Sequence, residues 1–167
     1  MLEIRGLQAG YGETQILRGI DLTVPEGALV AVLGANGAGK TTLNMTISGV
    51  VRPRGGEIRF AGQSLAALSP PEIVSLGLIH VPEGRKIFPN LNVREVLELG
   101  SYRRARAYRA RNLERVFGIF PRLAERTRQA VASDQNHRIE VVCVGAQGAA
   151  VGSSQREGSH HRIILPE

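Results

Sequence analysis

A continuous apolar run that leads directly into glycines limits the ways in which this chain can fold. Residues 28–33, Ala-Leu-Val-Ala-Val-Leu, contain no polar side chain, which is typical of a strand buried on both faces of a parallel sheet. The glycine-rich stretch that follows passes without a gap into residues 40–48, which have helical character and stop at Gly49. The sequence therefore predicts a strand, a glycine loop and a helix in direct succession, and with them an α/β fold.

The glycine-rich stretch fits the pattern G-x-x-x-x-G-K-[ST]. A loop with little side-chain bulk can wrap around a polyphosphate and point successive backbone N–H groups at its oxygens. The helix after the loop adds its positive N-terminal end, about half an elementary charge. Lys40 is expected to reach the β- and γ-phosphates, and the Thr41 hydroxyl to ligate Mg²⁺. The predicted nucleotide-binding residues of this loop are Gly34, Ala35, Asn36, Gly37, Ala38, Gly39, Lys40, Thr41 and Thr42.

Periodicity and capping signals predict the remaining elements. Apolar residues alternate over residues 20–24 and 57–60, as in half-buried strands, and residues 78–81 read as a further strand. Ser69 and Asn92 each precede a glutamate by three residues, which is the capping-box spacing at a helix start. We also expect an arginine-rich helix from Tyr102 to about Phe120, broken by Pro121.

The length and composition of the chain are those of a globular domain without a membrane span. With 167 residues, 43% of them hydrophobic, the chain can form one compact core. No stretch approaches the roughly 20 apolar residues that span a bilayer, and no signal peptide is recognisable, so we expect neither export nor a membrane span. Cys143 is the one cysteine, which fits a reducing cytoplasm.

The positive charge is concentrated in one segment. The net charge is +6, and nine arginines against two glutamates between Ser101 and Arg128 contribute +7 (9 − 2). A polyanionic partner would suit this charge, but Tyr102 and Tyr108 are the only candidates for stacking on bases. We therefore favour a solvated helical face and expect no nucleic-acid partner.

The residues around the loop resemble the ATP-binding subunits of ABC transporters. GALVAVLGANGAGKTTLNMTISGVVRPRGGEIRFAG is similar to the Walker A region of that family, and LIHVPEGRKIFPNLNVREVLELGSY is similar to its Q-loop and the start of its helical subdomain. The form V-P-E-G-R-x-I-F-P is similar to the branch that serves importers of branched-chain amino acids. The resemblance covers about residues 1–129.

This resemblance implies a P-loop NTPase-type sheet with an N-terminal antiparallel β subdomain and a partial helical subdomain. It implies ATP and Mg²⁺ as ligands, with Tyr11 stacking on adenine; the alternative for Tyr11 is a half-buried strand residue. Glu83 stands where most of the family has glutamine. Its carboxylate would bind Mg²⁺ or the attacking water as a catalytic group, or else serve only as a loop or N-cap carboxylate.

The implied partners are the membrane permease subunits of an importer and a second ATPase subunit. The implied location is cytoplasmic, peripheral on the inner face of the cell membrane. Together with the preceding motifs, the resemblance suggests an ATP-binding subunit that couples ATP binding and hydrolysis to transport.

Three motifs that the family carries downstream do not occur in the sequence. They are a signature loop resembling LSGGQ, a Walker B strand ending in Asp-Glu, and a switch histidine; His160 and His161 lie in an unrelated context. Because phosphoryl transfer to water needs these groups, we interpret the catalytic C-terminal part as missing and expect weak or no turnover. The alternative function is a truncated, non-catalytic module that binds ATP or the permease without turnover.

Residues 130–167 differ in character from the rest. We interpret residues 1–129 as the N-terminal part of an ABC ATPase domain and residues 130–167 as an atypical tail, either frameshifted or disordered. Without a Walker B strand, residues 28–33 would keep an unpaired apolar edge. The β-branched run at residues 139–144 is predicted to cover that edge.

Overall fold

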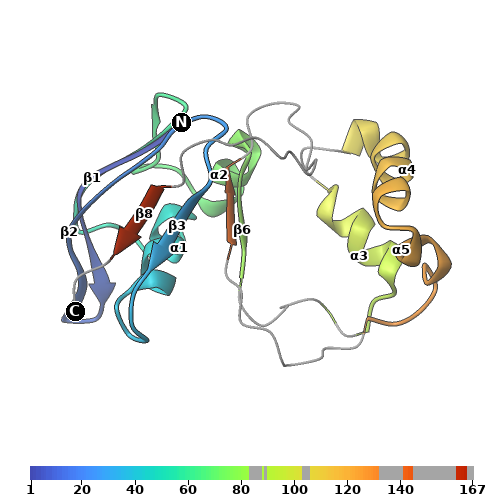
Figure 1. The fold of residues 1–167 in the computed structure, drawn as a ribbon, viewed down its shortest axis with the longest axis horizontal. Helices are drawn as coiled ribbons and strands as arrows, with labels where there is room; N and C mark the ends of the chain where they lie inside the picture. The colour runs from blue at the N-terminus through green and yellow to red at the C-terminus, as the bar shows by residue number, and fades with distance from the viewer. Residues whose placement is uncertain (83–87, 89, 103–105, 132–140, 145–160, 165–167) are drawn as a thin grey trace. The chain divides into compact units, whose positions relative to one another are not determined.

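The computed structural model describes residues 1–82, 88, 90–102, 106–131, 141–144 and 161–164. The chain divides into two compact units, one formed by Met1–Val81 with Val141–Glu167 and the other by Pro82–Glu140. The first unit contains the strands and the helix that follows the glycine loop, and the second contains the arginine-rich helices (Figure 1).

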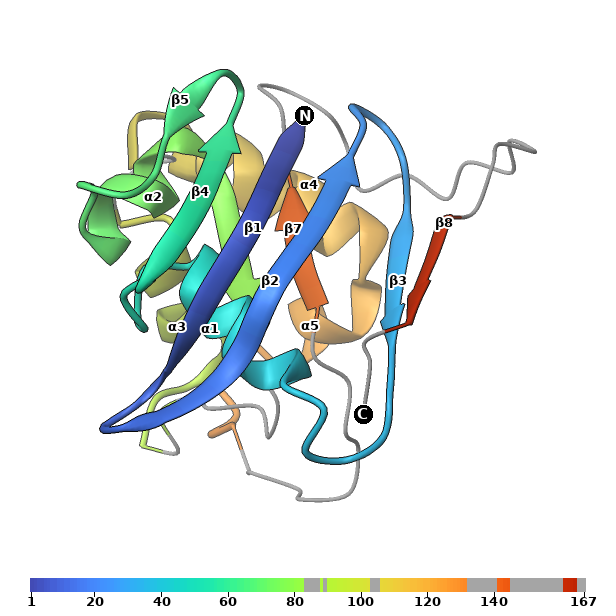
Figure 2. The same ribbon diagram turned by 90° about the vertical axis from the view of Figure 1, so that its left-hand side faces the viewer.

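A four-stranded antiparallel sheet forms the larger part of the first unit. Its order is β2-β1-β4-β5, so the long hairpin of the first two strands pairs through β1 with β4 (Figure 2). This arrangement confirms the expected antiparallel β subdomain. The strands are β1 (Leu2–Tyr11), β2 (Thr14–Val24), β4 (Gly55–Phe60) and β5 (Gln63–Ser64).

The inner face of this sheet packs against two helices, α1 (Lys40–Ile47) and α2 (Pro70–Leu76). Every second residue of β1 from Leu2 is buried until the strand bends, as the period of two requires. One hydrophobic cluster joins the sheet to both helices. Its fully buried large side chains are Leu2, Ile4, Leu7, Leu17, Leu43, Ile73 and Leu78.

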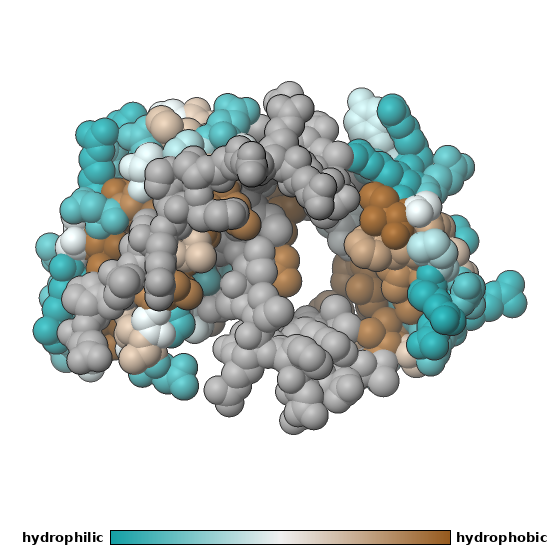
Figure 3. Space-filling model, in the orientation of Figure 1, coloured by the Kyte–Doolittle hydropathy of each residue, from teal (hydrophilic) through white to brown (hydrophobic). Residues whose placement is uncertain are grey.

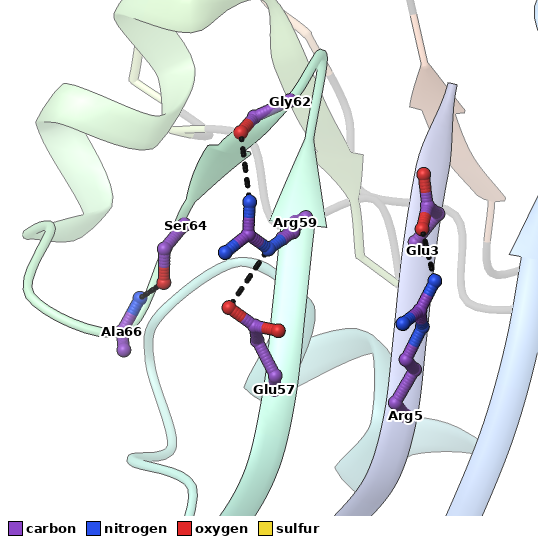
Figure 4. A network of polar contacts seen from close by, with 7 residues as sticks. All are labelled: Glu3, Arg5, Glu57, Arg59, Gly62, Ser64 and Ala66. Atoms are coloured by element: carbon purple, nitrogen blue, oxygen red, sulfur yellow. Dashed lines mark hydrogen bonds and ion pairs between the residues drawn. The ribbon is translucent and has the colours of Figure 1, made fainter.

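The outer face of the sheet carries paired charges (Figure 4). Arg5 contacts Glu3 at 3.1 Å, and Arg59 contacts Glu57 at 2.8 Å. In the register of β1 and β4, Glu3 lies opposite Arg59 and Arg5 lies opposite Glu57. Opposite charges therefore face each other both along and across the strands, which favours this register over a slip by one residue. The pairs are exposed, so each contributes little to overall stability.

Both predicted capping boxes are present. The Ser69 N–H donates to Glu72 Oε2 at 2.8 Å at the start of α2. In α3 (Val93–Gly100), the Asn92 N–H donates to Glu95 Oε2 at 2.8 Å, and the Asn92 Oδ1 accepts from the Glu95 N–H at 3.0 Å. The predicted strand at residues 78–81 is β6 (Leu78–Val81), directly after α2.

The second unit consists of α3, a 3-10 turn η1 (Arg106–Tyr108), α4 (Arg109–Ile119) and α5 (Pro121–Glu125). Hydrophobic residues gather over the region of α3 and α5, and hydrophilic residues line the margin of the unit (Figure 3).

The arginine-rich helix predicted from Tyr102 to about Phe120 is wrong at its beginning, because residues 106–108 form η1 and α4 starts only at Arg109. Pro121 ends that helix as expected and also occupies the first turn of α5, where a missing N–H costs nothing.

The arginines among the described residues of this unit lie on its surface, in agreement with a solvated helical face. Arg109 is the one half-buried arginine among residues 106–131, and its Nε donates to Ser101 Oγ at 2.8 Å. None of the helices in the described segments is long and apolar enough to cross a membrane.

The strand before the glycine loop differs from its prediction. The strand is β3 (Val30–Leu33), in which Val30 and Val32 are half-buried while Ala31 and Leu33 are exposed. The prediction that this strand is buried on both faces is therefore wrong. Within the described residues β3 pairs only with β8 (His161–Ile164), in parallel, and a two-stranded sheet leaves more of a strand uncovered than a wide sheet would.

The tail also pairs differently from the prediction. Residues 141–144 do form a strand, β7 (Val141–Val144), but it pairs antiparallel with β6 and not with the edge of β3. Composition indicated that this segment would be a strand. Its partner is fixed by tertiary topology, which composition does not encode.

Leu43 should be essential to the packing of α1, because its side chain is 1% exposed in the cluster below the sheet. We expect Leu43→Ala to lower the free energy of unfolding by about 2–5 kcal/mol through lost burial and a residual cavity. Leu29→Ala is the matched control, since Leu29 is 72% exposed, and should change it by less than about 0.5 kcal/mol. Urea denaturation of both variants would measure the difference; equal losses would contradict the assigned core.

Candidate functional site

The glycine loop, residues 34–39, connects the end of β3 to the start of α1. Gly37 has φ 92° and Gly39 has φ 89°, a left-handed region that side chains with a Cβ rarely adopt. Between them, the Ala38 N–H donates to the Ala35 carbonyl oxygen at 3.2 Å and closes a tight turn. Residues 34–37 are exposed. The backbone of the loop is therefore accessible to a ligand.

Strand β2 supports the loop from behind. A Cβ added to Gly39 would lie 3.0 Å from Leu17 Cδ2 and 3.1 Å from Ile16 Cγ2. Both distances are shorter than ordinary van der Waals contact, so the end of the loop rests directly on the antiparallel sheet. Gly39 is thus required by its dihedral angle and by the space available to it.

The Lys40 side chain folds back over the loop. Its Nζ donates to the carbonyl oxygens of Gly34 at 2.7 Å and Ala35 at 2.6 Å. An ammonium group has three N–H donors, so one remains beyond these two bonds. The arrangement places a positive charge at the mouth of the loop, where the phosphates of a nucleotide would lie.

The first turn of α1 adds further positive potential. The leading N–H groups of a helix have no partner within the helix, and the first turn of α1 contains no acidic residue that would compensate the helix dipole. Thr41 is exposed, so its hydroxyl can reach a ligand. The Thr42 side chain is 6% exposed and packs in the core, and a role for Thr42 would therefore come from its backbone N–H.

The exposed hydroxyl of Thr41 fits Mg²⁺, a hard cation that takes one or two protein oxygens and completes its octahedron with water and phosphate oxygens. Among the residues that the structure describes, no group of three or more His, Cys, Asp or Glu side chains could hold a metal ion. Glu83, the other predicted metal-binding and catalytic residue, lies outside the described residues. Its role stays a prediction.

Tyr11 lies at the end of β1 beside α1. Its hydroxyl donates to Met45 Sδ at 3.4 Å, and the residue is 49% exposed. Met45 follows Lys40 by five residues on the same helix. The structure therefore places an accessible aromatic ring next to the helix that begins with the loop lysine.

Sequence reasoning missed the residues that support this site. Met45 contacts the Tyr11 hydroxyl, Ile16 and Leu17 lie against Gly39, and Arg54 is bonded to the turn after Tyr11. The helical position of Met45 is readable from the sequence, but its contact with a strand 34 residues away is not. No signal in a single sequence would have indicated Arg54.

Comparison with known proteins decides the family. The ABC transporter family profile matches residues 17–151, which is most of the chain and extends past residue 129. The chain belongs to the ABC transporter family. Its first unit thus contains the Walker A loop of that family, followed by α1.

Individual relatives in the ABC transporter family cover different shares of the chain. The high-affinity branched-chain amino acid transport ATP-binding protein BraG of Pseudomonas aeruginosa is 33% identical over 145 residues, 87% of this chain and 62% of BraG. The autoinducer 2 import ATP-binding protein LsrA of an Enterobacter species is 41% identical over 95 residues, 57% of this chain and 19% of LsrA. This chain therefore spans under two thirds of the length of either relative.

A solved structure of the ATP binding subunit of an ABC transporter is similar to the present fold. The two have a TM-score of 0.67 and 29% sequence identity, over 80% of this chain and 56% of the other. The α/β fold of ABC ATPase domains, inferred from the loop and its flanking residues, is confirmed.

Gly39→Ala tests the contact between the loop and the sheet. Gly62 is the matched control, because its φ is also positive, 82°, while a Cβ there would meet nothing within 4 Å. Both variants carry the strain of a left-handed alanine, but only Gly39→Ala adds overpacking against β2, which should cost about 1–3 kcal/mol more. Chemical denaturation gives both values, and equal destabilisation would argue against the support from β2.

Proposed function

We propose that this chain binds Mg-ATP as the ATP-binding subunit of an ABC importer for branched-chain amino acids. The observation that carries the proposal is the position of Lys40, whose ammonium lies over the glycine loop at the positive end of α1. A triphosphate can replace the two loop carbonyls as partner of this ammonium, and phosphate is the better acceptor because it is charged.

The loop residues 34–39, Lys40, Thr41 and Tyr11 each have a role in this proposal. The amides of residues 34–39 surround the β- and γ-phosphates, Lys40 binds their oxygens, and the Thr41 hydroxyl ligates Mg²⁺. Bound Mg²⁺ would neutralise phosphate charge. Tyr11 stacks on the adenine ring. Its 49% exposure leaves the ring accessible for this role and fits the alternative of a half-buried strand residue equally.

The proposed substrate class rests on how far each relative extends along the chain. BraG matches 87% of the chain, whereas LsrA matches 57%. The form V-P-E-G-R-x-I-F-P is a second point in favour of branched-chain amino acids. We further propose permease subunits and a second ATPase subunit as partners, with the chain peripheral on the inner face of the membrane. We propose residues 1–129 as the N-terminal part of the ATPase domain and residues 130–167 as an atypical tail; the family match reaches residue 151 and so includes the first part of that tail.

A second candidate is a module that binds ATP or the permease without turnover. It is favoured by the sequence, which contains no Ser-Gly-Gly and no apolar run ending in Asp-Glu. These motifs supply the charge stabilisation and the Mg²⁺ carboxylate that hydrolysis requires.

Nucleotide binding should raise thermal stability and should depend on Lys40. At 100 times the dissociation constant, Mg-ATP stabilises the folded form by about 2.7 kcal/mol, or roughly 5–10 °C for a domain of this size. We expect Lys40→Ala to weaken binding in calorimetric titration about ten- to a hundred-fold, because it removes a charge-assisted bond to phosphate.

Arg18→Ala is the control for Lys40→Ala, since it removes an exposed positive charge from β2. Its affinity for Mg-ATP should match that of the unaltered chain. Equal affinities for Lys40→Ala and Arg18→Ala would defeat the assignment of the loop.

Phosphate release distinguishes the two candidate functions. With saturating Mg-ATP, we expect the purified chain to release phosphate no faster than Lys40→Ala does, because the hydrolytic motifs are absent from the sequence. Turnover well above that of Lys40→Ala would reject the non-catalytic module and favour a complete ATPase site.

A further inference from the structure

Arg54 is bonded to the chain on both sides of Tyr11. It lies directly before β4, where its backbone N–H donates to the Gln8 carbonyl oxygen at 2.7 Å. Its guanidinium Nη2 donates to the Gly12 carbonyl oxygen. One bond therefore holds β1 three residues before Tyr11, and the other holds the turn one residue after it.

The hairpin of β1 and β2 is irregular near its end, so the bonds from Arg54 help to hold it in place. The register of β1 and β2 shifts between Ala9 and Gly10, so the regular ladder is interrupted two residues before Tyr11. At Gly10 the strands approach so closely that a Cβ would lie 2.0 Å from the Thr14 carbonyl oxygen. Gly12 has φ 50°, a conformation of low cost only to glycine. Tyr11 still pairs with Thr14 in the ladder, and Arg54 adds bonds on either side of Tyr11 from the segment before β4.

The Tyr11 ring has a second anchor at its other end. Its hydroxyl donates to Met45 Sδ on α1 at 3.4 Å, and sulfur next to an aromatic ring is a favourable contact. The backbone of Tyr11 is thus held through Arg54 and its hydroxyl through Met45. About half of the residue, 49%, remains exposed.

We infer that Arg54 is a positioning residue for the base of the bound nucleotide, acting through the backbone on either side of Tyr11. A ring held in place before the ligand arrives loses little conformational freedom on stacking, so more of the stacking energy appears as affinity. Arg54 should affect the binding of the base and not that of the phosphates, because the phosphates are bound by the loop and by Lys40. This inference rests on the proposed binding of ATP.

The neighbouring Arg52 shows that the bonding of Arg54 is not a general property of this segment. Arg52 is also exposed, two residues earlier, yet it makes no hydrogen bond or ion pair in the part of the chain that the structure describes. Arg52→Gln therefore removes the same charge from the same segment without releasing the hairpin. It is a matched control for any electrostatic effect on an anionic ligand.

The test compares two ligands that share the phosphates and differ in the base. Calorimetric titration of the full chain with Mg-ATP and with magnesium tripolyphosphate separates base binding from phosphate binding. Arg54→Gln should weaken ATP binding about three- to ten-fold, the range for loss of one hydrogen bond, and leave tripolyphosphate binding unchanged. Arg52→Gln should change neither affinity. Arg54→Lys should recover part of the ATP affinity, because an ammonium can still donate to the Gly12 carbonyl.

Several results would overturn the inference. One is an ATP affinity of Arg54→Gln equal to that of the unaltered chain. Another is an equal loss of affinity for both ligands in Arg54→Gln, which would indicate a general structural role. If the unaltered chain binds both ligands equally well, the base contributes nothing. This inference and the proposed stacking of Tyr11 on adenine then fail, while phosphate binding by the loop stands. If the unaltered chain binds neither, the proposed function fails and the inference fails with it. Retained tripolyphosphate binding by Arg54→Gln would show that this variant is folded.

Discussion

The contact of the glycine loop with the antiparallel sheet fixes the geometry of the whole site. A Cβ at Gly39 would lie within 3.0–3.1 Å of the Leu17 and Ile16 side chains, so the loop and β2 are in tight contact there. From there, Leu43 and Ile47 continue the contact into the core. Because α1 is fixed in this way, Lys40 and Thr41 at its first turn occupy defined positions, and a short flexible loop becomes a site with fixed donors.

The same sheet connects the phosphate end of the site to its base end. Strand β1 carries Tyr11 at its terminus, β2 backs the loop, and Arg54 before β4 holds the hairpin that bears Tyr11. The charged outer face of the sheet, with Glu3 opposite Arg59, favours a single register. A slip of one residue would exchange the buried and exposed faces, and would displace both ends of the site together.

The local features of this chain could be predicted from its sequence, and the non-local ones could not. The capping boxes at Ser69 and Asn92 depend on residues three apart, and both were predicted correctly. The burial of β3 and the pairing of β7 depend on which strands lie beside them, and both were predicted wrongly. The phosphate loop was recognised because its chemistry requires a fixed spacing, whereas Arg54 acts through a backbone 42 residues away.

A crystal structure of the chain with Mg-ATP would show whether the backbone amides of the loop and the ammonium of Lys40 hold a triphosphate. We expect phosphate oxygens within hydrogen-bond distance of the loop amides, with Lys40 Nζ moved from the carbonyls of Gly34 and Ala35 onto the nucleotide. A nucleotide bound elsewhere, or a lysine still bonded to both carbonyls beside a bound triphosphate, would contradict this expectation.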